Sequence, residues 1–466
     1  MHTKTMNVAN ATLLDRSLGI FTRVHAREGV TSVLLLLNIF LILVAYYFIK
    51  PVREGWLSVS VIAGLSKLEI KSYSAFGQSL LLLGILPLYA RLAARFPRRK
   101  LITGTAVISS IILLVFWLLQ PGLLFERVPY SGVVFYMFVG IFSVTLVAQF
   151  WSFASDLYGH DKGGRLFPLV AVGASSGAVF GSWLGERLIR IDWLDSFDLI
   201  LLAVLPLAFA VWLAHLVDHR GSEGGHSEET VLRRQEPAAP MGRGAFRTIM
   251  ETRYLLGTAG MILLFNWIVA SGDNILFGIV QQALGMEFGQ INDPQKLAQA
   301  INTATTAFYS DLYFWVNLAG LLLQAFVVSR ILQVGGFTLL ILATPLVSLA
   351  AYFSMAIAPY LGIIKVMKIA ENSSNYSINN TARHMLWLPT TKAMMYQAKA
   401  TIDTLCVRIG DGLAALTVLI GTRIWSFSLV EFLVINVFLS MIWIGFAVYL
   451  SREFHRWTKG GNAEAV

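Results

Sequence analysis

The chain has 466 residues, of which 56% are hydrophobic and 14% are charged, and its mean hydropathy is +0.66. A chain of this length is too apolar to be a soluble protein, so the composition predicts a polytopic membrane protein embedded in the lipid bilayer. The formal net charge of +9 would suggest a nucleic-acid partner for a soluble chain. In a membrane protein it reports mainly the orientation of the loops, and no nucleic-acid partner is expected.

Residues 1–29 are predicted to form a cytoplasmic segment. They contain no apolar run that ends in a small-residue cleavage site, so we expect no removable signal peptide. Leu14, Leu18, Phe21 and Val24 recur at helical spacing opposite several arginines. This pattern fits a helix lying on an anionic membrane surface and fits a solvated amphipathic helix equally well.

Apolar runs of membrane-spanning length predict twelve transmembrane helices, six on each side of a long polar stretch. They begin near Val30, Ala75, Leu101, Ser131, Leu166, Leu199, Leu255, Ala307, Phe337, Ile357, Ala400 and Leu429. The predicted organisation is an N-terminal six-helix bundle over 30–217, a cytoplasmic linker over 218–252, a C-terminal six-helix bundle over 253–451 and a cytoplasmic tail over 452–466.

Basic residues are concentrated in the connections that follow the second, fourth and sixth predicted helices, as in Arg91–Lys100. The connections on the other side carry far fewer cations. Because cytoplasmic loops are enriched in lysine and arginine, we expect both termini in the cytoplasm and the protein in a bacterial inner membrane.

The two halves also repeat a loop pattern. The basic segment Arg91–Lys100 follows the second predicted helix, and a weaker copy, Arg330–Gly336, follows the eighth. Two six-helix repeats around a midplane cavity resemble the architecture of the major facilitator superfamily. The predicted fold class is therefore an all-α membrane protein with twelve helices in a 6+6 pseudo-symmetric arrangement of the major-facilitator type.

The first predicted helix carries Lys50, Arg53 and Glu54 at the end of its apolar run. At helical spacing they share one face, and Glu54 can pair with Lys50. An ionisable residue near the middle of a membrane costs about 2.5–3.5 kcal/mol on insertion scales, so such a cluster is a candidate functional site. The alternative is that the helix ends at Ile49 and the cations extend to the membrane interface.

Further ionisable residues lie inside later spans. Asp156 ends a polar stripe in the fourth predicted helix, and Asp273 lies in the seventh, two turns after Asn266. In hydrocarbon such residues must face protein or water. We expect Asp273 to pair with a cation of the first or eleventh helix, or to be protonated.

The tenth and eleventh predicted helices add cations. One face of the tenth carries a polar set with Glu371 at its margin: Lys365, Lys368, Asn372, Asn375 and Asn379. The eleventh opens with Lys399 and Asp403 at i, i+4, and we expect its Arg408 and Asp411 to form a structural ion pair. Together with the first helix, these residues provide inward-facing cations in both halves.

Glycines recur at every fourth position of the fifth predicted helix, at Gly173, Gly177, Gly181 and Gly185. This spacing predicts a groove that admits a neighbouring helix at close range. No phosphate loop, dinucleotide fingerprint or nucleophile constellation is present, so an enzyme is not expected. The single cysteine and the scattered histidines predict neither a disulfide nor a metal site, and no cofactor is expected.

Four motifs resemble the non-mitochondrial ATP/ADP translocases of plastids and obligate intracellular bacteria, together with their bacterial relatives. These motifs are Lys50-x-x-Arg53-Glu54, the segment from Trp151 to Pro168, Asn266-Trp267 through Asp273, and Lys399-Ala-Thr-Ile-Asp403 followed by Arg408. The resemblance implies nucleotide exchange by alternating access.

The key charges that this resemblance implies fall on Arg53, Asp161, Asp273 and Lys399. Arg53 stands where the family has lysine, and Asp273 stands where it has the longer glutamate. A planar guanidinium fork and a shorter acid change the geometry of both positions.

The sequence thus predicts a secondary transporter that exchanges phosphorylated anions, nucleotides first, through a central basic cavity. Arg53 and Lys399 are the expected anion ligands, and Trp151 or Trp267 could stack on the base. The alternatives are a major-facilitator permease for another small solute, proton-coupled through Asp273, and a membrane receptor or scaffold without transport. The cost of the intramembrane charges argues against the scaffold. The oligomeric state stays open.

Overall fold

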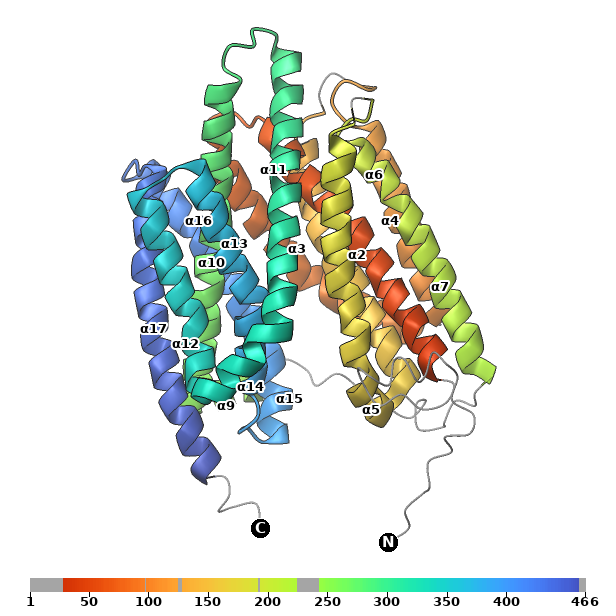
Figure 1. The fold of residues 1–466 in the computed structure, drawn as a ribbon, viewed down its shortest axis with the longest axis vertical. Helices are drawn as coiled ribbons and strands as arrows, with labels where there is room; N and C mark the ends of the chain where they lie inside the picture. The colour runs from red at the N-terminus through yellow and green to blue at the C-terminus, as the bar shows by residue number, and fades with distance from the viewer. Residues whose placement is uncertain (1–27, 97, 125–127, 192, 224–242, 461–466) are drawn as a thin grey trace. The chain divides into compact units, whose positions relative to one another are not determined.

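The computed structural model describes residues 28–96, 98–124, 128–191, 193–223 and 243–460, and these residues are almost entirely helical, with no strand among them (Figure 1). This confirms the all-α part of the prediction. The amphipathic segment before residue 28 and the middle of the predicted linker, 224–242, lie outside the described residues.

The first half of the chain contains α2 (Glu28–Val59), α3 (Lys67–Arg95), α4 (Arg98–Leu118), α5 (Ser131–Ile189), α6 (Asp198–Leu202) and α7 (Val204–Glu223). The second half contains α9 (Arg243–Glu251), α10 (Arg253–Glu287), α11 (Pro294–Leu322), α12 (Val328–Ile357), α13 (Leu361–Ser374), α14 (Asn380–Met385), α15 (Lys392–Thr401), α16 (Val407–Arg423) and α17 (Leu429–Gly460). Short π-helical turns join three pairs of these helices: η2 (Leu323–Val327), η3 (Asn375–Asn379) and η4 (Ile402–Cys406).

Ten stretches of the described chain are long and apolar enough to cross a membrane. One of them, Pro294–Ile357, holds both α11 and α12 and contains Gly336, whose φ of 58° interrupts the helical conformation. The segment from Leu361 onward, part of the predicted tenth span, is not among the ten; its helix α13 has 14 residues and includes Lys365, Lys368 and Glu371. The chain is thus an integral multi-pass membrane protein, and the count of twelve helices stays a prediction.

The helix α5 contains the fourth and fifth predicted spans. Arg165 bonds Glu28 in the first turn of α2, and from there the segment runs parallel to α2, with Gly177 beside Phe40. Tyr158, seven residues earlier, nevertheless bonds Ser32, one turn further along α2. If α5 ran straight back from Arg165, Tyr158 would lie beyond the first residue of α2. Tyr158 lies instead beside Ser32, within α2, so the chain reverses direction between residues 158 and 165.

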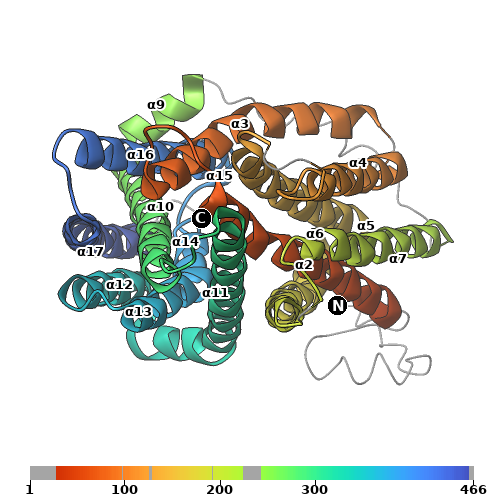
Figure 2. The same cartoon turned by 90° about the horizontal axis from the view of Figure 1, so that it is seen from above.

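The contacts between helices group the chain into two compact units. The first comprises Met1–Arg53, Gly84–Ser131 and Phe138–Glu236, and the second comprises Glu54–Leu83, Gly132–Met137 and Pro237–Val466. In the first, α4 packs along α7. In the second, α17 lies beside α10 and α12, α16 packs against α10, and α13 packs against α11 and α12 (Figure 2).

The predicted glycine groove is confirmed in the first unit. A Cβ atom on Gly177 would come within 2.8 Å of Phe40 Cα, and one on Gly181 within 2.9 Å of Val44 Cα. Real Cβ contacts are essentially never this short, so both positions need glycine to let α5 lie against the α2 backbone. This packing fixes the part of α2 that leads to Lys50 and Arg53.

Candidate functional site

The end of α2 holds the basic residues of the first predicted cluster. Lys50 is buried, with its ammonium 5.6 Å and 5.0 Å from the ring centres of Tyr46 and Tyr47, while Arg53 is partly exposed. Rings at this distance stabilise a cation where water is scarce. The helix continues through Pro51 to Val59, so Lys50 and Arg53 lie within it and not beyond its end.

Glu54 forms an ion pair with Lys71 of α3, a partner that its spacing along α2 did not indicate. Lys71 Nζ lies 2.5 Å from Glu54 Oε2, and the side chains are 4% and 1% exposed. The Lys71 ammonium also lies 4.4 Å from the ring centre of Tyr136. A buried pair of this kind is costly to break, because either partner alone would be an uncompensated buried charge.

A second buried cluster surrounds α13. Lys368 Nζ lies 2.5 Å from Glu371 Oε2 and 3.2 Å from Asp273 Oδ1. The hydroxyl of Tyr352 donates to Glu371 Oε1 at 2.9 Å. Lys368, Glu371 and Tyr352 are buried, whereas the side chain of Asp273 is 50% exposed. Asp273 is thus paired, as expected, but its partner comes from α13 and not from the first or eleventh predicted helix.

Lys365, one turn before Lys368, forms an ion pair with Asp311 of α11. Its ammonium lies 5.5 Å from the ring centre of Phe308, which is also on α11. The two lysines of α13 therefore have different partners on different helices. Both are compensated by carboxylates.

The cations of α15 and α16 are arranged differently from the expected i, i+4 pair. Asp403 accepts a hydrogen bond from Arg383 at 3.0 Å, and Lys399 is half-buried. Among the described residues, Lys399 makes no ion pair. Further along, the predicted pair of Arg408 with Asp411 is confirmed at 3.4 Å.

The residues predicted on α5 lie in the first unit. Asp156 is half-buried, and the side chain of Asp161 lies outside the described residues. Trp151 makes edge contacts with Phe150 and Phe167, at ring-centre distances of 5.4 Å and 5.7 Å.

Trp267, the other candidate for base stacking, lies on α10. Its indole N–H donates to Thr417 Oγ1 at 3.0 Å. This bond fixes the orientation of the ring.

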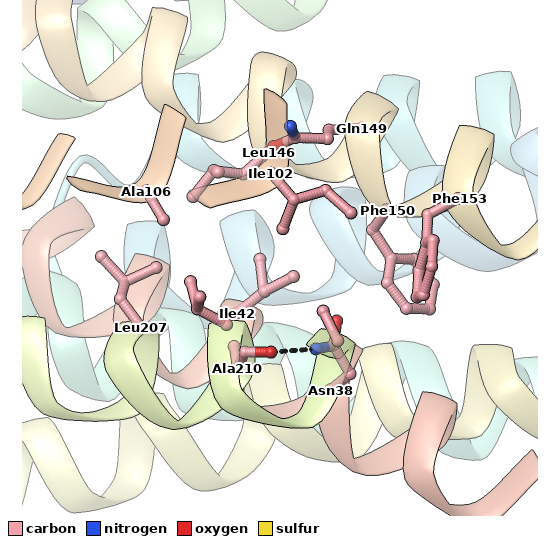
Figure 3. A pocket seen from close by; sticks show the side chains of 12 residues that line it. Asn38, Ile42, Ile102, Ala106, Leu146, Gln149, Phe150, Phe153, Leu207 and Ala210 are labelled. Carbon is pink, nitrogen blue, oxygen red and sulfur yellow. Dashed lines mark hydrogen bonds between the residues drawn. The ribbon is translucent and has the colours of Figure 1, made fainter. Parts of the chain in front are cut away.

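A small cavity in the first unit lies among α2, α4, α5 and α7 (Figure 3). Its lining is mostly aliphatic and aromatic, as with Ile42, Phe150 and Leu207, and its polar side chains are Asn38 and Gln149. Asn38 is already engaged, because its amide donates to the carbonyl oxygen of Ala210. With no charged group in its wall, this cavity is not suited to an anionic solute.

Sequence reasoning missed three functional side chains of these clusters. Lys71 precedes the predicted start of the second span near Ala75, so it gave no signal as an intramembrane charge, but it lies near the start of α3 and pairs with Glu54. Glu371 was placed at the margin of a polar face but is fully buried. Tyr352 gave no signal, because an isolated tyrosine in an apolar run is an ordinary core residue.

Solved transporter structures share this fold. A transporter of the POT family in complex with a thioalcohol-conjugated peptide superposes with a TM-score of 0.57 at 12% identity, covering 92% of this chain and 96% of that one. A variant of the nucleoside transporter NupG gives 0.54 at 12% identity, covering 92% and 99%. A bacterial homologue of the human lysosomal transporter Spinster gives 0.53 at 14% identity, covering 96% and 99%.

The all-helical multi-pass fold of the described residues resembles that of these solved proteins, and the family model that the sequence matches is that of a family of membrane transporters. The sequence places the protein in one family of membrane transporters. The model of the TLC ATP/ADP transporter family matches residues 118–454, and the chain belongs to this family.

A curated relative agrees with this assignment. The chain is 19% identical over 362 residues to ADP,ATP carrier protein 2 of Chlamydia pneumoniae. The match covers 67% of this chain and 64% of the carrier, so it spans less than two thirds of the carrier's length.

Proposed function

We propose that this protein exchanges nucleotides of the ATP/ADP type across a bacterial cytoplasmic membrane by alternating access. The observation that carries the proposal is the match to the ATP/ADP transporter family over residues 118–454. The likeness to a chlamydial ADP,ATP carrier supports the same class of substrate.

The charges of the site support an anionic solute. A nucleoside di- or triphosphate brings about three to four negative charges, and removing these from water requires fixed cations that replace the hydration shell. Lys71 and Lys368 are each compensated by a buried glutamate. Because the motifs Lys50-x-x-Arg53-Glu54 and Lys399-Ala-Thr-Ile-Asp403 resemble those of the ATP/ADP translocases, we assign the phosphates to Arg53 of α2 and to Lys399 of α15, with Lys50 beside Arg53.

Lys399 fits this role because Asp403, one turn further on, bonds Arg383 instead. Arg53 can offer two parallel N–H donors to a phosphate, whereas Lys399 acts as a point charge. The base would stack on Trp267, whose ring is held by its bond to Thr417, or on Trp151.

The remaining parts of the proposal concern architecture. Twelve helices in two six-helix repeats would place one cation of this pair on each repeat. When the carrier closes over a bound anion, both cations would approach that anion. When an empty carrier closes, the two positive charges would approach and repel each other. Such a carrier changes sides readily only when it is loaded, which is the physical basis of obligate exchange.

Competition against labelled ADP uptake into proteoliposomes tests the substrate class. Unlabelled nucleoside triphosphates and diphosphates should inhibit strongly, monophosphates weakly, and neutral nucleosides not at all, because the phosphates supply the binding energy. If a neutral nucleoside or an organic cation competes as well as ATP, the anion site is wrong and a permease for another solute takes its place.

A further inference from the structure

An arginine of α14 holds the acid that lies next to Lys399. Arg383 Nη2 donates to Asp403 Oδ1 at 3.0 Å, and the two side chains are 26% and 36% exposed. Asp403 lies in η4, one turn after Lys399 on the helix that continues from α15. Because side chains four residues apart on a helix are neighbours, the acid has two cations beside it and is bonded to one of them.

The position of Arg383 depends on α10. Its guanidinium lies 5.6 Å from the ring centre of Phe265, whose face attracts a cation at this distance. The hydroxyl of Tyr254 donates to the carbonyl oxygen of Leu386 at 2.6 Å, just after the end of α14. Both contacts come from α10, so this helix holds α14 and its arginine beside η4.

Lys399 lies beside this pair without joining it. In the part of the chain that the structure describes, Arg383 is the only cation paired with Asp403, and Lys399 makes no ion pair. The charges of all three side chains act on the imidazole of His384, so they lie close together. Two cations against one carboxylate leave one net positive charge, and this charge is on Lys399.

Removing the arginine would change the partner of the acid. A lysine and an acid at i, i+4 pair with each other, so Asp403 would turn to Lys399. A partly exposed pair has an equilibrium constant of about 1.4 to 5, and such a competitor lowers the affinity of the lysine for a phosphate about two- to sixfold. The uncompensated carboxylate would also repel the phosphate.

We propose, on the basis of the nucleotide exchange proposed above, that Arg383 is a positioning residue of the phosphate site. It binds and neutralises Asp403, and it thereby keeps the Lys399 ammonium available to the phosphates of the substrate. Arg383 acts through Asp403 and does not itself contact the nucleotide.

Two variants that each break the same ion pair test this role. ADP affinity is measured by isothermal titration calorimetry on the full-length protein in detergent. In Arg383→Gln the acid competes for Lys399, so affinity should fall about two- to sixfold. In Asp403→Asn the competitor is gone and Arg383 adds an uncompensated positive charge, so affinity should rise about twofold or more. A merely structural ion pair would weaken binding in both variants, and that result would overturn the proposal.

The double variant Arg383→Gln/Asp403→Asn separates positioning from direct binding. It removes the competing acid together with the arginine, so ADP affinity should return to within about twofold of the unmodified value. If Arg383 contacts the phosphates itself, the double variant binds as weakly as Arg383→Gln, and the positioning role is wrong. Arg456→Gln is the matched control, because it breaks an arginine–glutamate pair near the end of α17 and should leave ADP affinity unchanged.

The variant Lys399→Ala distinguishes this proposal from the proposed function. If Lys399→Ala binds ADP weakly while Arg383→Gln binds it normally, the positioning role fails and the phosphate site stands. If the unmodified protein does not bind ADP, or if Lys399→Ala binds it normally, the proposed phosphate site itself fails. Should Arg383→Gln not fold, the sign of the change in Asp403→Asn still decides, since a fall in affinity there overturns the positioning role.

Discussion

At the scale of single residues, we expect the buried ion pairs to contribute to stability and the proposed phosphate ligands to contribute to binding. Glu54 and Lys71 compensate one another in an environment that is almost fully shielded from water. Replacing Glu54 with alanine leaves the lysine unpaired, which we expect to cost about 3–5 kcal/mol. The double variant Glu54→Ala/Lys71→Met removes both charges and should recover most of the loss.

The thermal stability of the two variants is measured in detergent, with size-exclusion chromatography used to detect unfolding. A double variant that is as unstable as Glu54→Ala would show that the charge itself is not the cause.

The proposed phosphate ligands should behave in the opposite way. Arg53→Ala and Lys399→Ala remove cations assigned to the substrate, so we expect near-normal folding and a fall in nucleotide affinity of roughly 10- to 100-fold for each lost charged hydrogen bond. Arg53→Lys retains the charge and should lose less. Nucleotide affinity is measured by isothermal titration calorimetry on variants of equal protein quality. If both alanine variants bind nucleotide as tightly as the unmodified protein, the assignment is contradicted.

One contact predicted from the sequence, between two residues of the same helix, is confirmed. Arg408 and Asp411 were expected as a pair from their spacing, and the structure confirms it. The pairs of Glu54 with Lys71 and of Asp273 with Lys368 join different helices, and their partners follow from packing that no local spacing encodes. The sequence could therefore single out Glu54 and Asp273 as charged residues inside predicted spans, but it could not identify the partners that packing gives them.

At the scale of elements, the contact between α2 and α5 depends on small residues. Leucine at Gly177 would overlap the backbone at Phe40, and we expect a loss of at least about 1–3 kcal/mol as α5 moves away. Gly104→Ala in α4 is the control, since no atom lies within 4 Å of a Cβ at that position. Equal thermal stability of the two variants would exclude close helix packing as the role of the stripe.

Element boundaries were predictable where glycine or charge interrupts an apolar run. Gly336, predicted at the end of the loop after the eighth span, is the residue at which α12 departs from helical geometry. The tenth predicted span carries a polar face, and its buried Lys368 and Glu371 lower its hydropathy, so hydropathy alone does not identify it as a span.

At the scale of the whole molecule, the orientation in the membrane is the prediction that the distribution of cations makes most directly. Single cysteines introduced at residue 230 and at Lys296, in a variant without Cys406, should react from opposite sides of the membrane. We expect the first to be labelled only after the membrane is opened and the second to be labelled in intact cells. Labelling of residue 230 from outside would reverse the orientation.

The central claim is obligate exchange of nucleotides, and loading the inside of the vesicle tests it most directly. Uptake of labelled ADP should be rapid in proteoliposomes that contain unlabelled ATP. It should fall at least about tenfold in vesicles that contain only buffer, because the empty carrier does not return readily. Equal uptake in loaded and empty vesicles, or no uptake in either, would contradict the account.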